Sequence, residues 1–268
     1  MERLISQESI TLWSIRTGSI SPSAIPVLLF NGGPGCSDYL APLADMLTEP
    51  EDVHAHEESS AGESQVIRFE PRGCGRSTWR GPYDLETTIA DAERVREAWG
   101  IERWIVAGHS AGVDFAMAYG IAHPARTLGL IGLSGGRIVN DRDWSAAYKA
   151  RQSAAAARGA TPEDNGGITF SADPEVNRVG NLSWRAYIKR PGLLRDIAAI
   201  PFPCVFINAG EDIRDNWPTV QLAQLIPIAR YVEIPGAAHY SWITHAPEVR
   251  RHLRDAMKFI QQHPAASR

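Results

Sequence analysis

The sequence is poor in cysteine and has no long apolar run. Its 268 residues include three cysteines, Cys36, Cys74 and Cys204, an odd number too small for a disulfide framework and without metal-ligand spacing. No stretch approaches the ~18 apolar residues of a membrane helix, and the first residues contain no apolar core of signal-peptide length. We therefore expect free thiols, no membrane partner and a cytoplasmic location.

Clustered charge of one sign is also absent. The chain has 27 basic and 31 acidic residues, a formal charge of −4, and no long Lys/Arg run, which disfavours nucleic acid as a partner. Because 44% of the residues are hydrophobic and 22% are charged, the chain can bury one sizeable core rather than remain disordered. The composition favours a small-molecule or short-peptide substrate, and it indicates no oligomeric state.

Short apolar runs alternate with helical stretches along most of the chain. The runs are at 10–15, 26–30, 65–69, 104–107, 128–133, 204–207 and 231–234, and the helical stretches are at 85–99, 113–123 and 247–262. Such alternation predicts an α/β protein with a mostly parallel sheet flanked by helices. We assign residues 1–136 and 200–268 to this core.

Two segments interrupt the alternation. Residues 137–199 contain helical stretches at 144–158 and 176–188 around a Gly/Pro-containing loop, which predicts a helical cap inserted between two strands. Residues 49–64 are acidic and poor in apolar residues, which favours a mobile loop. His54 and His56 in that loop have carboxylate neighbours. Two histidines on a solvated loop do not by themselves make a metal site. We therefore expect neither a bound metal nor a cofactor.

The pentapeptide Gly108-His109-Ser110-Ala111-Gly112 lies between a predicted strand and a predicted helix. A sharp turn of this kind lifts a serine hydroxyl clear of the backbone and points the first amides of the helix toward it. Glycines on both sides allow the strand and the helix to approach closely, and allow the serine to hold strained backbone angles. The pattern predicts that Ser110 is a nucleophile.

A serine nucleophile needs a base and an orienting acid. Asp212 follows the apolar run at 204–207, and His239 follows the run at 231–234, in the order expected for a serine, acid and histidine set. Loops after parallel strands meet at one edge of the sheet, so the three residues can converge. Glu211 and Asp215 remain alternatives for the acid, and His245 for the base.

The run Asn31-Gly32-Gly33-Pro34-Gly35 directly follows another predicted strand. Its glycines let the backbone approach a developing oxyanion, and we predict that the amides of Gly33 and Ala111 form the oxyanion hole.

That run resembles the His-Gly-Gly-Pro-Gly motif of the proline iminopeptidase group of α/β-hydrolases. The segment 71–77, Pro-Arg-Gly-Cys-Gly-Arg-Ser, is similar to the Gln-Arg-Gly-Cys-Gly-Arg-Ser segment of the same group. The resemblance implies an α/β-hydrolase fold with a helical cap, a Ser110, Asp212 and His239 triad, and Gly33 as the oxyanion glycine. Asn31 replaces the motif histidine and Glu70-Pro71 replaces Asp-Gln, which changes the hydrogen bonding of these loops.

The predicted cap departs further from that group, whose aminopeptidases hold the free amine of the substrate with cap carboxylates. Residues 137–199 contain ten basic and seven acidic residues, a balance that does not favour a cation. Glu175, with Asp173 behind it, is the best candidate for an amine anchor, although each is more readily explained as a solvated surface acid. Three aromatic residues near the acid and the base could line a substrate pocket or pack in the core: Trp217, Tyr240 and Trp242.

These features predict a cofactor-free serine hydrolase that cleaves an ester or amide through an acyl-enzyme. Aminopeptidase activity on an N-terminal proline or another small residue is the leading specific prediction. A carboxylesterase or lactonase acting on a small acyl compound is the alternative enzyme. A ligand sensor that retains the hydrolase machinery with little turnover is the alternative of another class.

Overall fold

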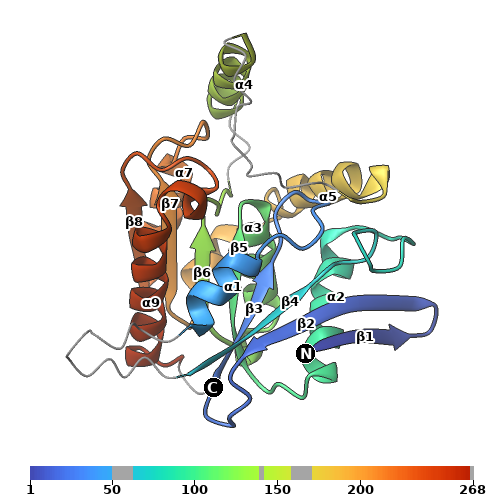
Figure 1. Ribbon diagram of the computed structural model, residues 1–268. Coiled ribbons are helices and arrows are strands. Elements are labelled where there is room, and N and C mark those ends of the chain that lie inside the picture. Colours follow the sequence, from blue (N-terminus) through green and yellow to red (C-terminus); the bar gives the residue numbers. More distant parts are fainter. Residues whose placement is uncertain (50–62, 139–141, 158–170, 266–268) are drawn as a thin grey trace.

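A computed structural model describes residues 1–49, 63–138, 142–157 and 171–265 of the chain. Across these residues runs one sheet of eight strands in the order β1-β2-β4-β3-β5-β6-β7-β8 (Figure 1). The strands are β1 (Glu2–Gln7), β2 (Ile10–Gly18), β3 (Ile25–Phe30), β4 (Ser64–Phe69), β5 (Trp104–His109), β6 (Thr127–Leu133), β7 (Cys204–Ala209) and β8 (Ala229–Ile234).

The sheet is parallel from β4 to β8, as the alternation of strands and helices predicts. Strand β2 pairs antiparallel with β4, and β1 pairs antiparallel with β2 at the outer edge. The sequence pattern did not indicate β1, because most of its residues are exposed and it lacks the apolar periodicity that marks a buried strand.

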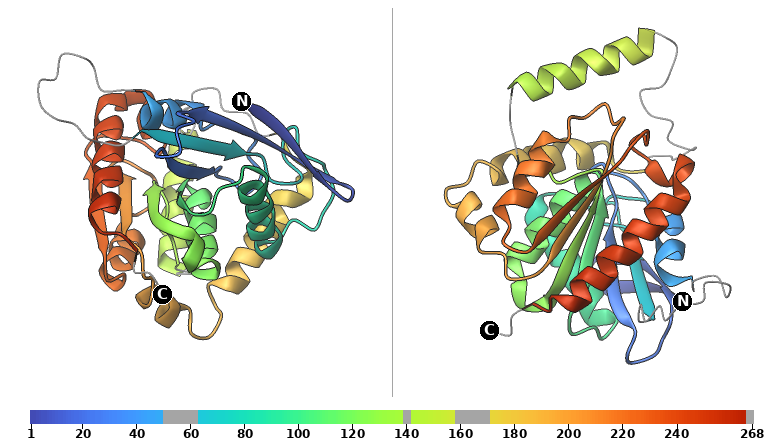
Figure 2. Two further views of the ribbon diagram at one scale, coloured as in Figure 1. Left: turned by 90° about the horizontal axis from the view of Figure 1, so that it is seen from below. Right: turned by 90° about the vertical axis from the view of Figure 1, so that its left-hand side faces the viewer.

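Helices cover both faces of the sheet (Figures 1 and 2). Helices α1 (Ala41–Thr48) and α9 (Ala246–Gln262) pack on one face, where their apolar side chains join those of the strands in one buried cluster. Helices α2 (Leu85–Ala98), α3 (Ala111–Ala122) and α7 (Trp217–Leu225) contribute to the cluster on the other face. Two short helices lie between these elements: η1 (Pro124–Arg126) follows α3, and α8 (Ser241–Thr244) precedes α9.

Three further helices lie between β6 and β7, in the segment that the sequence marks as an interruption: α4 (Arg142–Ala157), α5 (Pro174–Tyr187) and α6 (Leu193–Ala198). Figure 1 shows α4 standing apart from the other helices, beyond the carboxyl ends of the strands. The Trp144 indole nitrogen donates a hydrogen bond of 3.3 Å to the backbone oxygen of Asp215, which follows β7. Most of the predicted loops at 49–64 and 159–173, including His54 and His56, lies outside the described residues.

None of the helices in the described part of the chain is both long and apolar enough to cross a membrane. Within the same residues, no group of three or more His, Cys, Asp or Glu side chains is arranged to hold a metal ion.

Candidate active site

Ser110 occupies the sharp turn between β5 and α3. Its backbone angles, φ +57° and ψ −125°, lie where residues with a side chain rarely occur. A Cβ atom on Gly108 would lie 2.3 Å from the carbonyl of Gly112, and one on Gly112 would lie 2.1 Å from the backbone oxygen of Phe30. The turn therefore has the close strand-to-helix approach and the strained serine that the pentapeptide predicts.

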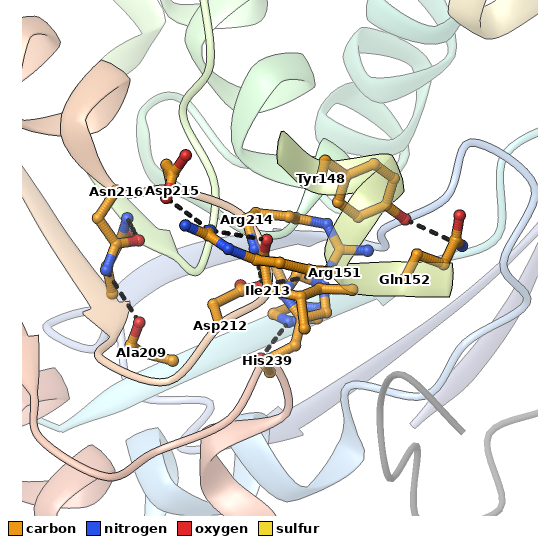
Figure 3. Close-up of polar contacts among 12 residues, drawn as sticks. Tyr148, Arg151, Gln152, Ala209, Asp212, Ile213, Arg214, Asp215, Asn216 and His239 are labelled. Carbon is orange, nitrogen blue, oxygen red and sulfur yellow. Dashed lines mark hydrogen bonds and ion pairs between the residues drawn. The ribbon is translucent and has the colours of Figure 1, made fainter. Parts of the chain in front are cut away.

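The loops after β7 and β8 bring Asp212 and His239 together (Figure 3). The Nδ1 atom of His239 lies 2.6 Å from Oδ2 of Asp212, and both side chains are buried, with exposed fractions of 2% and 3%. Arg214 donates to the other Asp212 oxygen from its backbone nitrogen, at 2.9 Å, and from its guanidinium, at 3.2 Å. Burial opposes ionisation of Asp212, but the hydrogen bond with His239 and the Arg214 charge hold its pKa far below the usual range.

The alternative acids and base lie elsewhere. Asp215 forms an ion pair with Arg151 of α4, at 2.5 Å, and Glu211 is exposed. The Nδ1 atom of His245 contacts the hydroxyl of Thr244 at 2.8 Å. Of the three acids Glu211, Asp212 and Asp215, Asp212 is the one whose carboxylate contacts the ring of His239.

Ser110 and His239 lie at the same edge of the sheet. The ring of His239 is centred 4.6 Å from the ring of His109, the residue that precedes the serine. A hydrogen bond from the Ser110 hydroxyl to Nε2 of His239 is the contact that would complete the triad, and in free enzymes such contacts are often long and shorten when substrate binds.

The glycine-rich loop after β3 lies beside the serine. A Cβ atom on Gly32 would be 3.2 Å from Cβ of Ser110, and Gly33 has a φ of +117°, a conformation that favours glycine. Gly33, Ser110 and Ala111 line the same cavity. Ala111 is the first residue of α3, so its amide has no partner within the helix and can donate to an oxyanion.

His109 has a more defined position than core packing alone requires. Its Nε2 atom donates to the backbone oxygen of His239 at 3.0 Å, and its Nδ1 atom lies 2.6 Å from the hydroxyl of Tyr39. The Tyr39 hydroxyl therefore donates to Nδ1, and it accepts from the amide of Gly32 at 2.9 Å. Burial, reinforced by the neighbouring His239, lowers the pKa of His109 well below its usual value, so the ring is neutral.

The residues that depart from the family motifs form hydrogen bonds in these loops. The buried Glu70 carboxylate accepts from the amide of Asp38 at 3.0 Å, and from the backbone nitrogen and guanidinium of Arg76 at 2.6 and 2.7 Å. The Nδ2 atom of Asn31 donates to the backbone oxygen of Phe69 at 2.9 Å. The amide oxygen of Asn31 is buried without a hydrogen-bond partner.

The cavity at Ser110 has a volume of about 360 Å³, near the small end of the range for ligand pockets. Asp114 is the one acidic residue among the described residues that line it, and four of the lining residues are basic. The lining residues are Gly33, Ser110, Ala111, Asp114, Arg137, Trp144, Ser145, Tyr148, Lys149, Asn181, Trp184, Arg185, Ile188 and Arg214.

The four residues proposed from the sequence to bind substrate lie outside this lining set. Glu175 is exposed on α5 and pairs with Arg178, one helical turn away, at 2.9 Å. Trp217 begins α7 and is 38% exposed. Tyr240 and Trp242 are buried, with ring centres 5.1 and 4.7 Å from the ring of His109, so they pack beside the loop that carries His239.

Sequence reasoning missed all five charged lining residues, although the sequence held a signal for three of them. Asp114 is four residues after Ser110, the helical spacing that places two residues on one face. Arg214 is two residues after Asp212, and Arg137 follows the run of glycines after β6. Asp114 therefore lies on the helix that follows Ser110, and Arg137 and Arg214 lie in loops after strands of the same sheet.

The cysteines are free and buried, as expected from their number. Burial raises the pKa of the Cys74 thiol to about 12, so it is protonated near neutral pH and a poor nucleophile.

Comparison with known proteins agrees with this architecture. The model of the "alpha/beta hydrolase fold" family matches residues 25–150. A proline iminopeptidase of Neisseria meningitidis is 34% identical over 114 residues, which cover 41% of this chain and 33% of that protein. The chain thus spans about a third of the length of this relative.

Two solved structures resemble nearly the whole chain at low sequence identity. The proline iminopeptidase of Mycobacterium smegmatis has a TM-score of 0.70 and 18% identity, and the likeness covers 98% of each chain. The enol-lactonase of Burkholderia xenovorans LB400 has a TM-score of 0.69 and 21% identity, over 93% of this chain and 97% of that one. The chain therefore has the α/β-hydrolase fold, and part of it is distantly homologous to proline iminopeptidases.

Proposed function

We propose that the protein is a serine hydrolase that cleaves a carboxylic ester through an acyl-enzyme, with Ser110 as nucleophile, His239 as base and Asp212 as orienting acid. The observation that carries this proposal is the buried contact of 2.6 Å between Asp212 and His239, at the edge of the sheet where the strained Ser110 faces a cavity. This is the arrangement that a serine requires in order to lose its proton to a base.

The reaction follows from these positions. Asp212 accepts a hydrogen bond at Nδ1 of His239, which leaves Nε2 unprotonated to take the Ser110 proton as Oγ attacks the carbonyl carbon. The amides of Gly33 and Ala111 donate to the oxyanion that forms. His239 then gives the proton to the departing alkoxide, and the acyl group stays on Ser110. Water repeats the sequence and releases the acid.

The charge of the cavity favours an ester over a peptide with a free amine. Four of its lining residues are basic, and Glu175, the candidate amine anchor, is exposed and paired with Arg178. Positive walls repel an ammonium group, while a neutral or anionic ester meets no such penalty. The likeness to the enol-lactonase is compatible with ester chemistry on this fold, and a lactone is an internal ester.

Aminopeptidase activity on an N-terminal proline is a second candidate, because the partial homology points to it. Asp114 is the cavity-lining acid available to hold an amine, since Glu175 lies elsewhere. For that role the Asp114 carboxyl has to be ionised while the amine binds.

Labelling and turnover test the proposal together. We expect a fluorophosphonate to label the protein once per chain and short-chain aryl esters to turn over steadily, with both activities lost in Ser110→Ala. Prolyl and alanyl arylamides distinguish the two enzymes. Faster hydrolysis of the prolyl arylamide than of the esters would establish the aminopeptidase. Labelling without turnover of any substrate would favour a ligand sensor.

A further inference from the structure

The cavity above Ser110 has an excess of positive charge. Arg137 and Arg214 contribute half-buried side chains, and Lys149 and Arg185 are exposed residues of α4 and α5. Asp114 is the lining acid among the described residues, and its Oδ1 atom accepts from the backbone nitrogen of Arg137 at 3.0 Å rather than from a guanidinium.

Arg137 is the unusual member of this group. Its guanidinium carbon lies 5.1 Å from the centre of the Trp144 ring, and none of the ion pairs among the described residues includes this side chain. Burial and the charge of Arg214 lower its pKa, while Asp114 and Asp212 act in the opposite direction. A partly desolvated cation that faces a second cation is costly unless an anion lies between them.

Arg214 connects this charge to the candidate triad. It donates to Asp212 at 2.9 and 3.2 Å, and its guanidinium carbon lies 5.2 Å from the ring of Tyr148, another residue that lines the cavity. Asp212 is also bonded to His239, so it does not neutralise both arginines. A negative charge supplied from the cavity would offset the repulsion between Arg137 and Arg214.

We infer that the substrate carries a carboxylate on its acyl part, which Arg137 and Arg214 bind while Lys149 and Arg185 attract it to the cavity. This role rests on the proposed function of Ser110, because the carboxylate defines which acyl group the serine receives. A guanidinium presents a planar fork of donors that matches a carboxylate. The volume of about 360 Å³ suits a small acyl chain, such as the half-ester of a short dicarboxylic acid.

A binding measurement tests the inference without relying on turnover. The Ser110→Ala protein is titrated with monomethyl glutarate, its neutral analogue dimethyl glutarate, and methyl phosphate. We expect the monoester to bind at least about tenfold more tightly than the diester, and salt to weaken this preference. Equal affinities for the monoester and the diester would overturn the inference. Tighter binding of methyl phosphate would assign the site to phosphate instead.

Substitution of the arginine tests where the preference arises. Introduced into the Ser110→Ala protein, Arg137→Gln should reduce the preference for the monoester to about threefold or less. The matched control is Arg178→Gln, which removes an exposed cation of α5 that is paired with Glu175 and absent from the cavity lining. The control should retain the preference. Loss of the preference in both variants would indicate a general effect of charge and contradict a site at Arg137.

Kinetics with the active protein separate this inference from the proposed function. We expect 4-nitrophenyl hydrogen glutarate to have at least a tenfold higher kcat/KM than its methyl-capped counterpart, and the ratio to fall in Arg137→Gln, by about the factor seen in binding. If neither ester turns over but the binding preference is present, the proposed function fails and the anion site stands. If both esters turn over equally, the anion site fails and the hydrolase stands.

Discussion

The ring of His109 donates a hydrogen bond of 3.0 Å from its Nε2 atom to the backbone oxygen of His239. Through Tyr39, the same ring is connected to the amide of Gly32 in the loop after β3. One neutral imidazole thus connects the loop of the proposed base to the loop of the proposed oxyanion hole. The hydrogen bonds to both loops require the tautomer in which Nε2 carries the proton.

Breaking this connection should slow catalysis without weakening substrate binding. We expect His109→Phe and Tyr39→Phe each to reduce kcat about tenfold with little change in KM, because each removes hydrogen bonds that position both loops. The double variant should be no slower than the slower single variant, since the residues act in one chain of bonds. Tyr231→Phe, which removes a hydroxyl bond to Glu233 on β8, is the control and should leave kcat unchanged. Additive effects in the double variant would contradict the connection.

The backbone of Ser110 predicts an unusual effect on stability. Since φ +57° with ψ −125° strains any residue that has a Cβ atom, Ser110→Gly should have a larger free energy of unfolding than Ser110→Ala, by about 1 kcal/mol. Urea denaturation of the two variants measures the difference. Both should lose fluorophosphonate labelling. A glycine variant less stable than the alanine variant would show that the turn is unstrained.

Asp114 predicts a dependence of stability on pH. Burial raises its pKa to about 7 in spite of the Arg137 charge, whereas a carboxyl group in an unfolded chain titrates near pH ~4. The folded state therefore binds more protons between these values, and the contribution of Asp114 to stability falls as pH rises from about 4 to about 7 and is level above.

Denaturation at several pH values checks this expectation. Asp114→Asn keeps an oxygen acceptor for the amide of Arg137 but does not titrate, so the variant should gain stability relative to wild type as pH rises over this interval. Asp255→Asn, at an exposed site on α9, should track the wild type. Parallel curves for Asp114→Asn and wild type would mean that the carboxyl ionises normally.

Glu70 should be a major source of stability for the loops around the site. Its carboxylate is 2% exposed and accepts hydrogen bonds from Asp38 and Arg76, so Glu70→Ala leaves several donors without a partner. We expect a loss of about 2–3 kcal/mol in the free energy of unfolding. Glu97→Ala, which removes a 70% exposed acid 3.7 Å from Arg96, should cost less than about 0.5 kcal/mol. Similar losses in both variants would contradict a structural role for Glu70.

Local sequence patterns predicted much of the fold because the central strands are buried on both faces. The apolar runs at 26–30 and 204–207, for example, lie within β3 and β7. Strand β1 and helix α7 were missed, since β1 is mostly exposed and α7 has a weak periodicity that ends in a Pro-containing turn. Their positions depend on pairing and packing with distant segments, which a single sequence does not show.

The candidate triad was predictable because each member directly follows a strand, and the ends of parallel strands share an edge. The residues that line the cavity were not, because which side chains of the segment between β6 and β7 face it depends on how the helices of that segment lie over the sheet. Glu175 and Arg185 are both on α5, yet Arg185 lines the cavity and Glu175 does not. The roles assigned to the triad and to the oxyanion amides remain predictions.

The pairing of Phe30 with Gly108 in adjacent parallel strands has an evolutionary consequence. The loop that carries Gly33 and the turn that carries Ser110 leave the sheet side by side, so their spacing is set by the ladder between β3 and β5. The basic side chains contributed by α4 and α5 come from the segment between β6 and β7. Selection can therefore change that segment, and with it the charge of the cavity, while the spacing of the two loops stays fixed by the sheet.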